Sequence, residues 1–269
     1  MRNEPRSGHA RRGFGVAGAL PKEVIRELAA AVEAAGYDTF WVNDTPDGDG
    51  LAALQTAAAA TTTIHLGVGV IPLDRQPPDL IAARVRELAL PADRLILGLG
   101  SGRGEGGLDR VRTGAAALRQ ETSALIVIGA LGPKMCRLAG EVSNGVLLNW
   151  LTPDYAQSTA ELVLEAASEA GQPRPYVAGY VRTALGGEAQ ERFRQEGDRY
   201  ASFPAYGAHF ARMKADPLET GVVGESATEI SSGLAAFDAV LDEVVVRAIV
   251  ADDAIPAYRQ LIAAAAPGR

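Results

Sequence analysis

Short apolar runs alternate with longer segments of helical period along almost the whole chain. Eight runs of strand character occur, at residues 14–17, 39–43, 64–70, 95–99, 124–128, 145–148, 176–183 and 243–250. Amphipathic stretches lie between or after them, at 22–35, 50–60, 79–88, 108–118, 153–170 and 255–265. Strands that alternate with helices are typical of βα units around a parallel sheet, and runs that are apolar throughout suit strands covered on both faces. Eight such units predict a single α/β domain, a (β/α)8 TIM barrel.

No linker or change of composition divides the chain, so we expect an N-terminal tail at 1–12 and one barrel at 13–269. The one irregular stretch is 186–226, an insertion between the seventh and eighth strands that holds a charged helical segment and several aromatic residues. It is long for a βα connection, and excursions of this size in barrels often lie over the active face. An excursion that packs into the core would explain the aromatic residues nearly as well.

Charge and composition exclude several classes of function. The chain has 33 acidic and 26 basic residues and a net charge of −7, which does not favour nucleic acid or an anionic membrane as a partner. No stretch approaches the roughly 20 apolar residues of a membrane span. The apolar run after Arg11 and Arg12 is interrupted at Pro21, too early for an export signal. A single cysteine, Cys136, fits a reducing compartment. We therefore expect a cytoplasmic protein that acts on a small molecule.

Polar residues stand where the second and sixth strands should end. In a barrel, functional side chains come from the loops at these strand ends. Asn43 and Asp44 follow the second strand and open a loop with two further aspartates, which could equally be a solvated turn with a helix cap. Asn149 and Trp150 follow the sixth strand and should face the barrel mouth. We predict that Asn43, Asn149 and Trp150 bind the substrate.

A glycine-rich loop follows the fourth strand. Gly102, Gly104 and Gly107 match G-x-G-x-x-G between a strand and a helix, the pattern of dinucleotide-binding loops. The next strand ends without an acidic residue to hold a ribose hydroxyl, so the dinucleotide interpretation fails one of its requirements. We expect instead a loop that lies against some other cofactor, with Ser101 and Arg103 as polar contacts.

The loop after the fifth strand has the features of a phosphate cradle. Gly132 precedes Pro133 at the start of a predicted helix, where backbone N–H groups favour an anion, and Lys134 adds a positive charge. A glycine-softened turn with a solvated lysine is the alternative. The three histidines lack the spacing of a ligand set, and we predict no metal.

Taken together, these segments resemble a known family, the luciferase-like flavin and deazaflavin oxidoreductases, which are (β/α)8 barrels. The resemblance extends from about residue 13 to about residue 265. It is strongest in GYDTFWV at 36–42, LGVGVIPLDR at 66–75, RLILGLGSG at 94–102, IGALGPKM at 128–135 and GVLLNWLTP at 145–153. The last two segments are similar to the branch that uses coenzyme F420, an 8-hydroxy-5-deazaflavin.

The resemblance implies a cofactor laid across the barrel mouth. Its phosphate would be held by the loop after the fifth strand, with help from the loop after the fourth. These segments comprise Ala130, Leu131, Gly132, Pro133, Lys134 and Met135, and Ser101, Gly102 and Arg103. In this family a ridge after the third strand, often with a non-prolyl cis peptide, backs the cofactor ring. Val70 and Ile71 occupy that place.

The resemblance also implies a hydride transfer at C5 of the deazaflavin, with an acid of the protein or the solvent handling the proton. Asp44 and Glu105 stand near positions where several relatives carry a histidine and a glutamate for substrate binding or proton transfer, so both are catalytic candidates. The missing histidine puts a sugar-phosphate dehydrogenase role in doubt. An FMN-dependent monooxygenase supplied by a separate reductase is the alternative enzyme. A flavin- or deazaflavin-binding protein without turnover is the alternative outside catalysis. Family members often dimerise, so a homodimer is an assembly to test.

Overall fold

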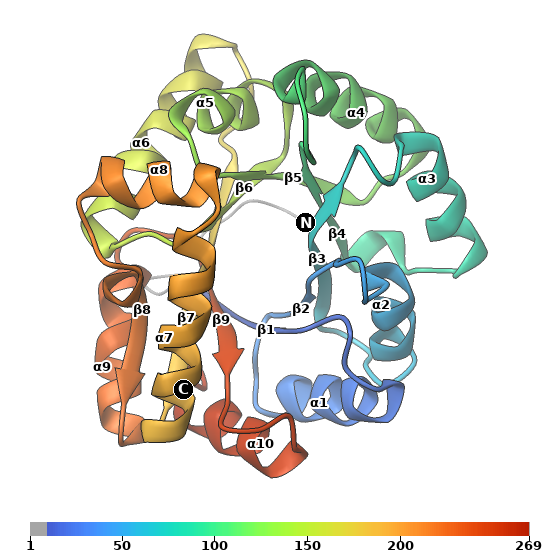
Figure 1. Ribbon diagram of the computed structural model, residues 1–269. Coiled ribbons are helices and arrows are strands. Elements are labelled where there is room, and N and C mark those ends of the chain that lie inside the picture. The colour runs from blue at the N-terminus through green and yellow to red at the C-terminus, as the bar shows by residue number, and fades with distance from the viewer. Residues whose placement is uncertain (1–9, 269) are drawn as a thin grey trace.

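The computed structural model describes residues 10–268, and a ring of parallel strands surrounded by helices forms its centre (Figure 1). The strands are β1 (Arg11–Val16), β2 (Thr39–Val42), β3 (His65–Pro72), β4 (Leu95–Gly100), β5 (Leu125–Ala130), β6 (Gly145–Asn149), β7 (Tyr176–Leu185), β8 (Gly221–Gly224) and β9 (Glu243–Ile249). The α-helices are α1 (Lys22–Ala34), α2 (Gly50–Ala58), α3 (Pro78–Glu87), α4 (Gly107–Glu121), α5 (Pro133–Val142), α6 (Pro153–Glu169), α7 (Gly187–Ala201), α8 (Pro204–Met213), α9 (Ala227–Asp238) and α10 (Ile255–Ala264). Two short 3-10 helices are η1 (Ala92–Arg94) and η2 (Pro217–Thr220).

Eight of the strands close into a parallel barrel, which confirms the predicted fold. The strand order is β6-β5-β4-β3-β2-β1-β9-β7, and β6 also pairs with β7 to complete the ring. Helix starts follow the local sequence. Asp49 accepts a hydrogen bond from the Ala52 N–H at 3.0 Å and caps α2, as its position before Gly50 suggests. Among the described residues, no helix combines the length and apolar character that crossing a membrane requires.

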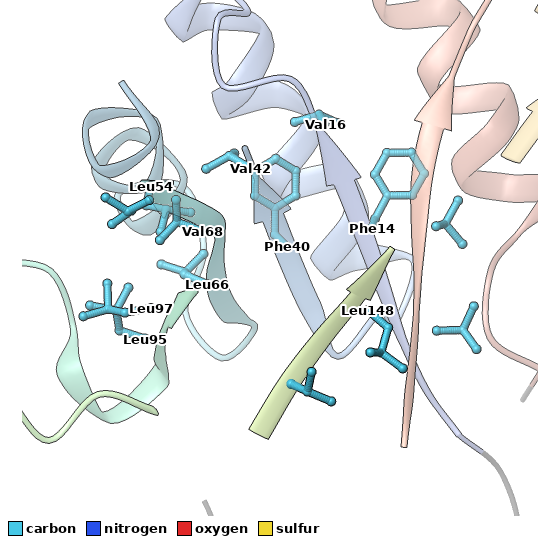
Figure 2. Close-up of a cluster of buried hydrophobic side chains, with 14 of the residues drawn as sticks. Phe14, Val16, Phe40, Val42, Leu54, Leu66, Val68, Leu95, Leu97 and Leu148 are labelled. Atoms are coloured by element: carbon cyan, nitrogen blue, oxygen red, sulfur yellow. The ribbon is translucent and has the colours of Figure 1, made fainter. Parts of the chain in front are cut away.

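Alternate side chains of each strand point to opposite sides of the barrel wall. Those on the outer side pack with the helices in one large buried cluster, here called the outer core. Figure 2 shows part of it, with Phe14, Val16, Phe40, Val42, Leu66, Val68, Leu95, Leu97 and Leu148 on strands and Leu54 on α2. Those on the inner side form a second buried cluster, the inner cluster, which includes Trp41, Ile96, Val127, Leu147, Tyr176, Ala178, Tyr180 and Val245. The barrel is therefore a packed core, and a ligand can approach only at one of its ends.

The described chain differs from the sequence prediction in three places. Strand β1 begins at Arg11, inside the segment 1–12 that we expected to be a tail, while residues 1–9 lie outside the described part. Helix α9 was not expected, because two serines and a glycine weaken its helical pattern. Strand β8 is an additional strand within the insertion, and with four residues it is too short to stand out in the sequence.

Strand β8 alters how the barrel wall is built. The lower part of β7, from Tyr176 to Tyr180, pairs with β6. From Arg182 to Leu185, the same edge of the sheet is continued by β8, which pairs with β7 in parallel. Strands β6 and β7 therefore separate near the mouth, here meaning the end of the barrel where the strands finish. The segment 186–226 fills the separation, and we call it the excursion.

Candidate functional site

The peptide bond between Gly69 and Val70 is cis and lies at the mouth end of β3. We expected the ridge at Val70 and Ile71, and the structure divides these two residues. Val70 packs against the inner cluster. The side chain of Ile71 is fully buried in the outer core, so it faces the helices and not the mouth. Of the two residues, only Val70 is placed to contact a ligand at the mouth.

Glycines on β4 and β5 make room for the Val70 side chain. A Cβ atom built on Gly98 would lie 3.2 Å from Val70 Cγ1, and one built on Gly129 would lie 2.7 Å from the same atom. A Cβ atom on Gly100 would lie 2.7 Å from Val70 Cγ2. Any side chain at Gly129 or Gly100 would therefore displace Val70. The backbone of these glycines and the two methyl groups of Val70 thus form a small platform, which is suited to a flat ring.

The loop that we predicted to form a phosphate cradle is the start of α5, and a second cation lies near it. Gly132 is the N-cap residue and Pro133 opens the helix. Lys134 is exposed on the first turn. Arg212, on α8 of the excursion, approaches the same turn, because a Cβ atom on Gly132 would lie 3.8 Å from Arg212 Nη2. Two cations therefore flank a helix N-terminus, which favours an anion such as a phosphate.

The remaining residues of this loop have different surroundings. Ala130 is buried and ends β5, while Leu131 is half-buried. Met135 packs against the outer core. Burial raises the pKa of the Cys136 thiol to about 11, with Arg212 acting in the opposite direction. Cys136 is thus a packing residue on α5 and not a thiolate at the site.

The glycine-rich loop after β4 is held by an arginine of the helix that follows it. Arg110 on α4 donates to the carbonyl oxygens of Ser101 at 2.6 Å, Arg103 at 3.3 Å and Glu105 at 2.9 Å. The loop therefore folds back on its own helix. The Arg103 and Glu105 side chains are exposed, and Ser101 is half-buried. A guanidinium has several donors, so one arginine can bind three carbonyl oxygens of a glycine-rich loop at once.

Gly102 brings this loop against the loop after β3. Its φ of +69° is a conformation that glycine adopts readily, and a Cβ atom there would lie 1.9 Å from Asp74 Oδ1. Asp74 also accepts a hydrogen bond from the Arg103 N–H at 2.9 Å. Gly102 thus supports the rim of the mouth through its backbone.

Asp44 is held by three neighbours. Its side chain is 2% exposed and forms an ion pair with Arg75. It accepts hydrogen bonds from the Gly50 N–H at 3.1 Å and from Gln76 Nε2 at 3.2 Å. Burial raises the pKa of Asp44, while these partners act to lower it. The carboxylate links the loops after β2 and β3, and the loop residues that bind it were not singled out from the sequence.

Asn43 supports a neighbouring loop as well. Its side-chain oxygen accepts a hydrogen bond from the Gly18 N–H at 2.8 Å, which ties β2 to the loop after β1. The Asn43 side chain is half-buried. Its amide nitrogen can still donate to a ligand at the mouth, because the described contact uses the oxygen.

Asn149 and Trp150 lie where β6 separates from β7, but they differ in access to the mouth. Asn149 is half-buried, and its side-chain oxygen accepts from Arg182 Nη1 at 2.7 Å. Trp150 is fully buried, with a φ of +57°. Its ring stacks on Phe193 of α7 at 6.0 Å between centroids. Trp150 therefore does not face the mouth, because the excursion covers it.

Arg182 joins β7 to both β6 and the excursion. Its guanidinium carbon lies 3.4 Å from the centre of the Trp150 ring, and its Nε donates to Glu196 of α7 at 2.7 Å. Burial lowers the pKa of Arg182, and the Glu196 carboxylate opposes that change. Arg182 is 3% exposed, so its charge is neutralised inside the protein.

The excursion thus packs against the barrel and also reaches the mouth. The buried cluster at this contact consists of Ala189, Phe193 and Phe210 of the excursion with Trp150, Ala184 and Ile249 of the barrel, and Tyr200, Tyr206, Met213 and Leu218 are partly buried around them. His209 of α8 is fully buried, and its Nε2 lies 2.7 Å from the Trp150 carbonyl oxygen. The aromatic residues pack as one of the two interpretations of the sequence expected. That the excursion lies over an active face stays a prediction.

Comparison with known proteins gives a match over most of the chain. The family model described as "Luciferase-like monooxygenase" matches residues 8–120 and 105–264. The 5,10-methylenetetrahydromethanopterin reductases of Methanolobus tindarius and Archaeoglobus fulgidus are each 28% identical, over 184 and 178 residues. These alignments cover 55% and 53% of this chain, and 56% and 54% of the relatives. The chain therefore spans about half the length of the curated relatives it matches.

Solved structures show the same fold at lower identity. An F420-dependent secondary alcohol dehydrogenase in complex with an F420-acetone adduct aligns with a TM-score of 0.76 and 16% identity, over 96% of this chain and 99% of that one. The coenzyme F420-dependent tetrahydromethanopterin reductase of Methanopyrus kandleri gives 0.75 and 17%, over 96% and 97%. The oxygenating constituent of 3,6-diketocamphane monooxygenase from Pseudomonas putida, in complex with FMN, gives 0.71 and 16%, over 94% and 97%.

Proposed function

We propose that this chain, which belongs to the luciferase-like monooxygenase family, is an oxidoreductase that uses coenzyme F420 to transfer a hydride to or from a small organic substrate. The observation that carries the proposal is the pairing of two features at one mouth. A flat platform around Val70 lies on β3, β4 and β5, and a cation-flanked helix N-terminus follows β5.

The residues present fit such a cofactor. A deazaflavin ring needs a surface without protruding side chains, and Gly98, Gly100 and Gly129 provide one beneath Val70. A phosphate group needs N–H donors and positive charge, which the first turn of α5 provides together with Lys134. Both requirements are met within three consecutive βα units, β3 to α5, so one extended molecule can satisfy them together.

Binding, orientation and exclusion of water are the tasks of this chain. When bound, F420 supplies the C5 atom that exchanges a hydride with the substrate, while one proton is exchanged alongside. The platform would hold the ring at a fixed depth. Asn43 and Asn149 are the half-buried polar residues that we propose to contact the substrate. Trp150 acts as a positioning residue, because it lies beneath the excursion and supports Asn149 through Arg182.

Asp44 and Glu105 differ in their suitability for handling the proton. The carboxylate of Asp44 is enclosed by Arg75, Gln76 and the Gly50 N–H. The side chain of Glu105 is exposed on the loop after β4. We therefore propose Glu105 as the group that can meet a bound substrate, and Asp44 as a residue that holds the rim in place.

A fluorescence titration tests the choice of cofactor. We expect F420 to bind with micromolar or better affinity, and FMN to bind at least tenfold more weakly. Tighter binding of FMN, with peroxide formed from reduced FMN in air, would instead support an FMN-dependent monooxygenase. The oxygenating constituent of 3,6-diketocamphane monooxygenase is described as an enzyme of that class. Binding of F420 without turnover of any enone, alcohol or cyclic imine would support a cofactor-binding protein. Binding of neither would overturn all three.

Gly132→Val tests the place of the phosphate. The backbone of Gly132 is extended, and the nearest atom to an added Cβ is Arg212 Nη2 at 3.8 Å, so the fold has room for the change. The valine methyl groups would occupy the anion position, and we expect F420 affinity to fall at least tenfold. Gly187→Ala is the matched control, because nothing lies within 4 Å of its Cβ position. Unchanged affinity in Gly132→Val would place the phosphate elsewhere.

A further inference from the structure

Two arginines lie side by side on the inner face of the barrel at its mouth. In the parallel ladder between β7 and β9, Arg182 is in register with Arg247. Residues of β9 alternate in direction, since Val245 belongs to the inner cluster while Val244 and Val246 belong to the outer core. Arg247 therefore faces inward, next to Arg182. Like charges directly opposite each other on neighbouring strands destabilise a sheet.

Of these two arginines, only Arg182 forms an ion pair within the described residues, although the charge of Arg247 also lowers the pKa of the Glu196 carboxylate. Arg182 pairs with Glu196 at 2.7 Å. Arg247 is half-buried and donates from Nη1 to the backbone carbonyl oxygen of Ala248 at 2.7 Å. No carboxylate of residues 10–268 forms an ion pair with Arg247. A guanidinium that has no ion-pair partner among residues 10–268 thus stands at the mouth of a protein whose net charge is −7.

The position of Arg247 suits a ligand better than a structural partner. Its only hydrogen bond to the described chain uses Nη1, which leaves the edge formed by Nε and Nη2 for a planar anion. A guanidinium edge binds a carboxylate through two parallel N–H bonds. Partial burial weakens screening by water and strengthens such a pair. The acidic surface offers no general attraction to an anion, so recognition depends on this local charge.

We infer that Arg247 binds a carboxylate of the substrate, and hence that the substrates are small carboxylic acids. The inference rests on the proposed function, because the platform around Val70 and the cradle at α5 are assigned to the cofactor on the opposite side of the mouth. Strands β9 and β7 then provide the substrate side. The other anion that could reach Arg247 is the cofactor ring itself. The experiment distinguishes a substrate carboxylate from the ring.

Benzoate and benzamide are suitable probes, because they share shape and differ in charge. Calorimetric titration of the F420-loaded protein should show benzoate binding at least tenfold more tightly than benzamide.

In Arg247→Gln we expect benzoate affinity to fall about 10- to 100-fold, as loss of a charge-assisted bond implies. Benzamide and F420 affinities should stay within twofold. Arg247→Lys should restore part of the benzoate affinity. Arg259→Gln, which removes an exposed arginine of α10, is the matched control.

Stability gives a second measurement that separates a ligand role from a structural one. Because Arg247→Gln removes a like charge next to Arg182, the unfolding midpoint should stay the same or rise. Equal binding of benzoate and benzamide, or of neither, would overturn the inference, and so would a loss of F420 affinity in Arg247→Gln. Failure of the wild-type protein to bind F420 is a different result, which overturns the proposed function. Benzoate titration of the cofactor-free protein then still tests the anion site.

Discussion

Arg182 Nη1 donates to the side-chain oxygen of Asn149 at 2.7 Å, across the place where β6 and β7 separate. The same guanidinium binds Glu196 of α7, so one buried side chain connects the end of β6, the middle of β7 and the excursion. Closure of the barrel at the mouth therefore depends on a polar contact where the backbone ladder between β6 and β7 has ended.

Arg182→Met should destabilise the protein by about 3 kcal/mol, the usual cost of removing one partner from a buried ion pair. The exposed fractions of the two side chains, 4% for Arg182 and 16% for Glu196, place the pair in the interior. Urea unfolding of Arg182→Met, Glu196→Gln and the double variant forms a double-mutant cycle. A coupling energy of at least about 1 kcal/mol is expected. Additive effects would show that the two residues act independently.

The contact between Val70 and Gly129 predicts a compensating pair of substitutions. Gly129→Ala places a Cβ atom 2.7 Å from Val70 Cγ1 and should cost about 1–3 kcal/mol of stability through overpacking. Adding Val70→Ala removes Val70 Cγ1, the atom that the new Cβ would approach too closely. The double variant should be more stable than the sum of the single effects predicts, by about 1 kcal/mol. If chemical denaturation shows no such recovery, Val70 does not lie over Gly129.

Arg212→Gln should weaken F420 binding about 5- to 10-fold, because it removes one of the two cations at the start of α5. The effect should shrink as salt is added, since Arg212 is exposed. Arg194→Gln, an exposed arginine of α7 that pairs with Glu191, serves as the control in the same titration. A salt-independent loss would point to a change in the fold of α8.

Glu105→Gln should lower turnover about 100-fold or more while leaving F420 affinity intact, as expected for a group that handles a proton. Asp44→Asn should have the opposite profile. It loses the ion pair with Arg75, so we expect about 2 kcal/mol of lost stability and less than a tenfold change in turnover. Steady-state kinetics measures the turnover of both variants, and unfolding curves measure their stability. The reverse outcome would assign the proton to Asp44.

Glu243 predicts how stability changes with pH. It is fully buried at the end of the barrel away from the mouth, where it meets Thr39, Tyr176 and Trp41 Nε1, the last at 2.8 Å. Burial raises the pKa of Glu243 above its ordinary value of 4.5, although these partners act to lower it. The native state therefore holds this proton more tightly than the unfolded state does.

The contribution of protonated Glu243 is full below pH 4.5 and is lost as the pH rises through the raised pKa. The free energy of unfolding of the wild type should thus fall with rising pH relative to that of Glu243→Gln. Urea titrations between pH 4 and pH 8 measure the difference. Glu121→Gln, an exposed carboxyl group on α4, is the control. A difference that does not change with pH would show that burial fails to shift this group.

The sequence was sufficient for the barrel because its strands are consecutive and their apolar runs are buried on both faces. It was less informative where tertiary contacts decide the outcome. Ile71 and Val70 are adjacent apolar residues, and only the register of β3 shows that they face opposite sides. Trp150 directly follows a strand, as a mouth residue would, but α7 and α8 cover it.

Arg212, which sequence reasoning missed, has a weak local signal. It lies in a helix where a charged residue is normally solvated, and its place near the start of α5 comes from the packing of the excursion. The start of α9 did carry a signal. Ser226 is followed three residues later by Glu229, a capping-box spacing, and its hydroxyl accepts from the Glu229 N–H at 3.3 Å.

The separation of β6 from β7 makes one part of the mouth interchangeable. Both ends of the excursion join elements that the barrel already fixes, β7 before it and α9 after it, and β8 continues the sheet edge that β6 leaves. A different contiguous segment inserted between Leu185 and Ser226 could rebuild the wall beside β7 while the platform at Val70 stayed as it is. Under the proposed function, a change of substrate would then require neither a new barrel nor a new cofactor site.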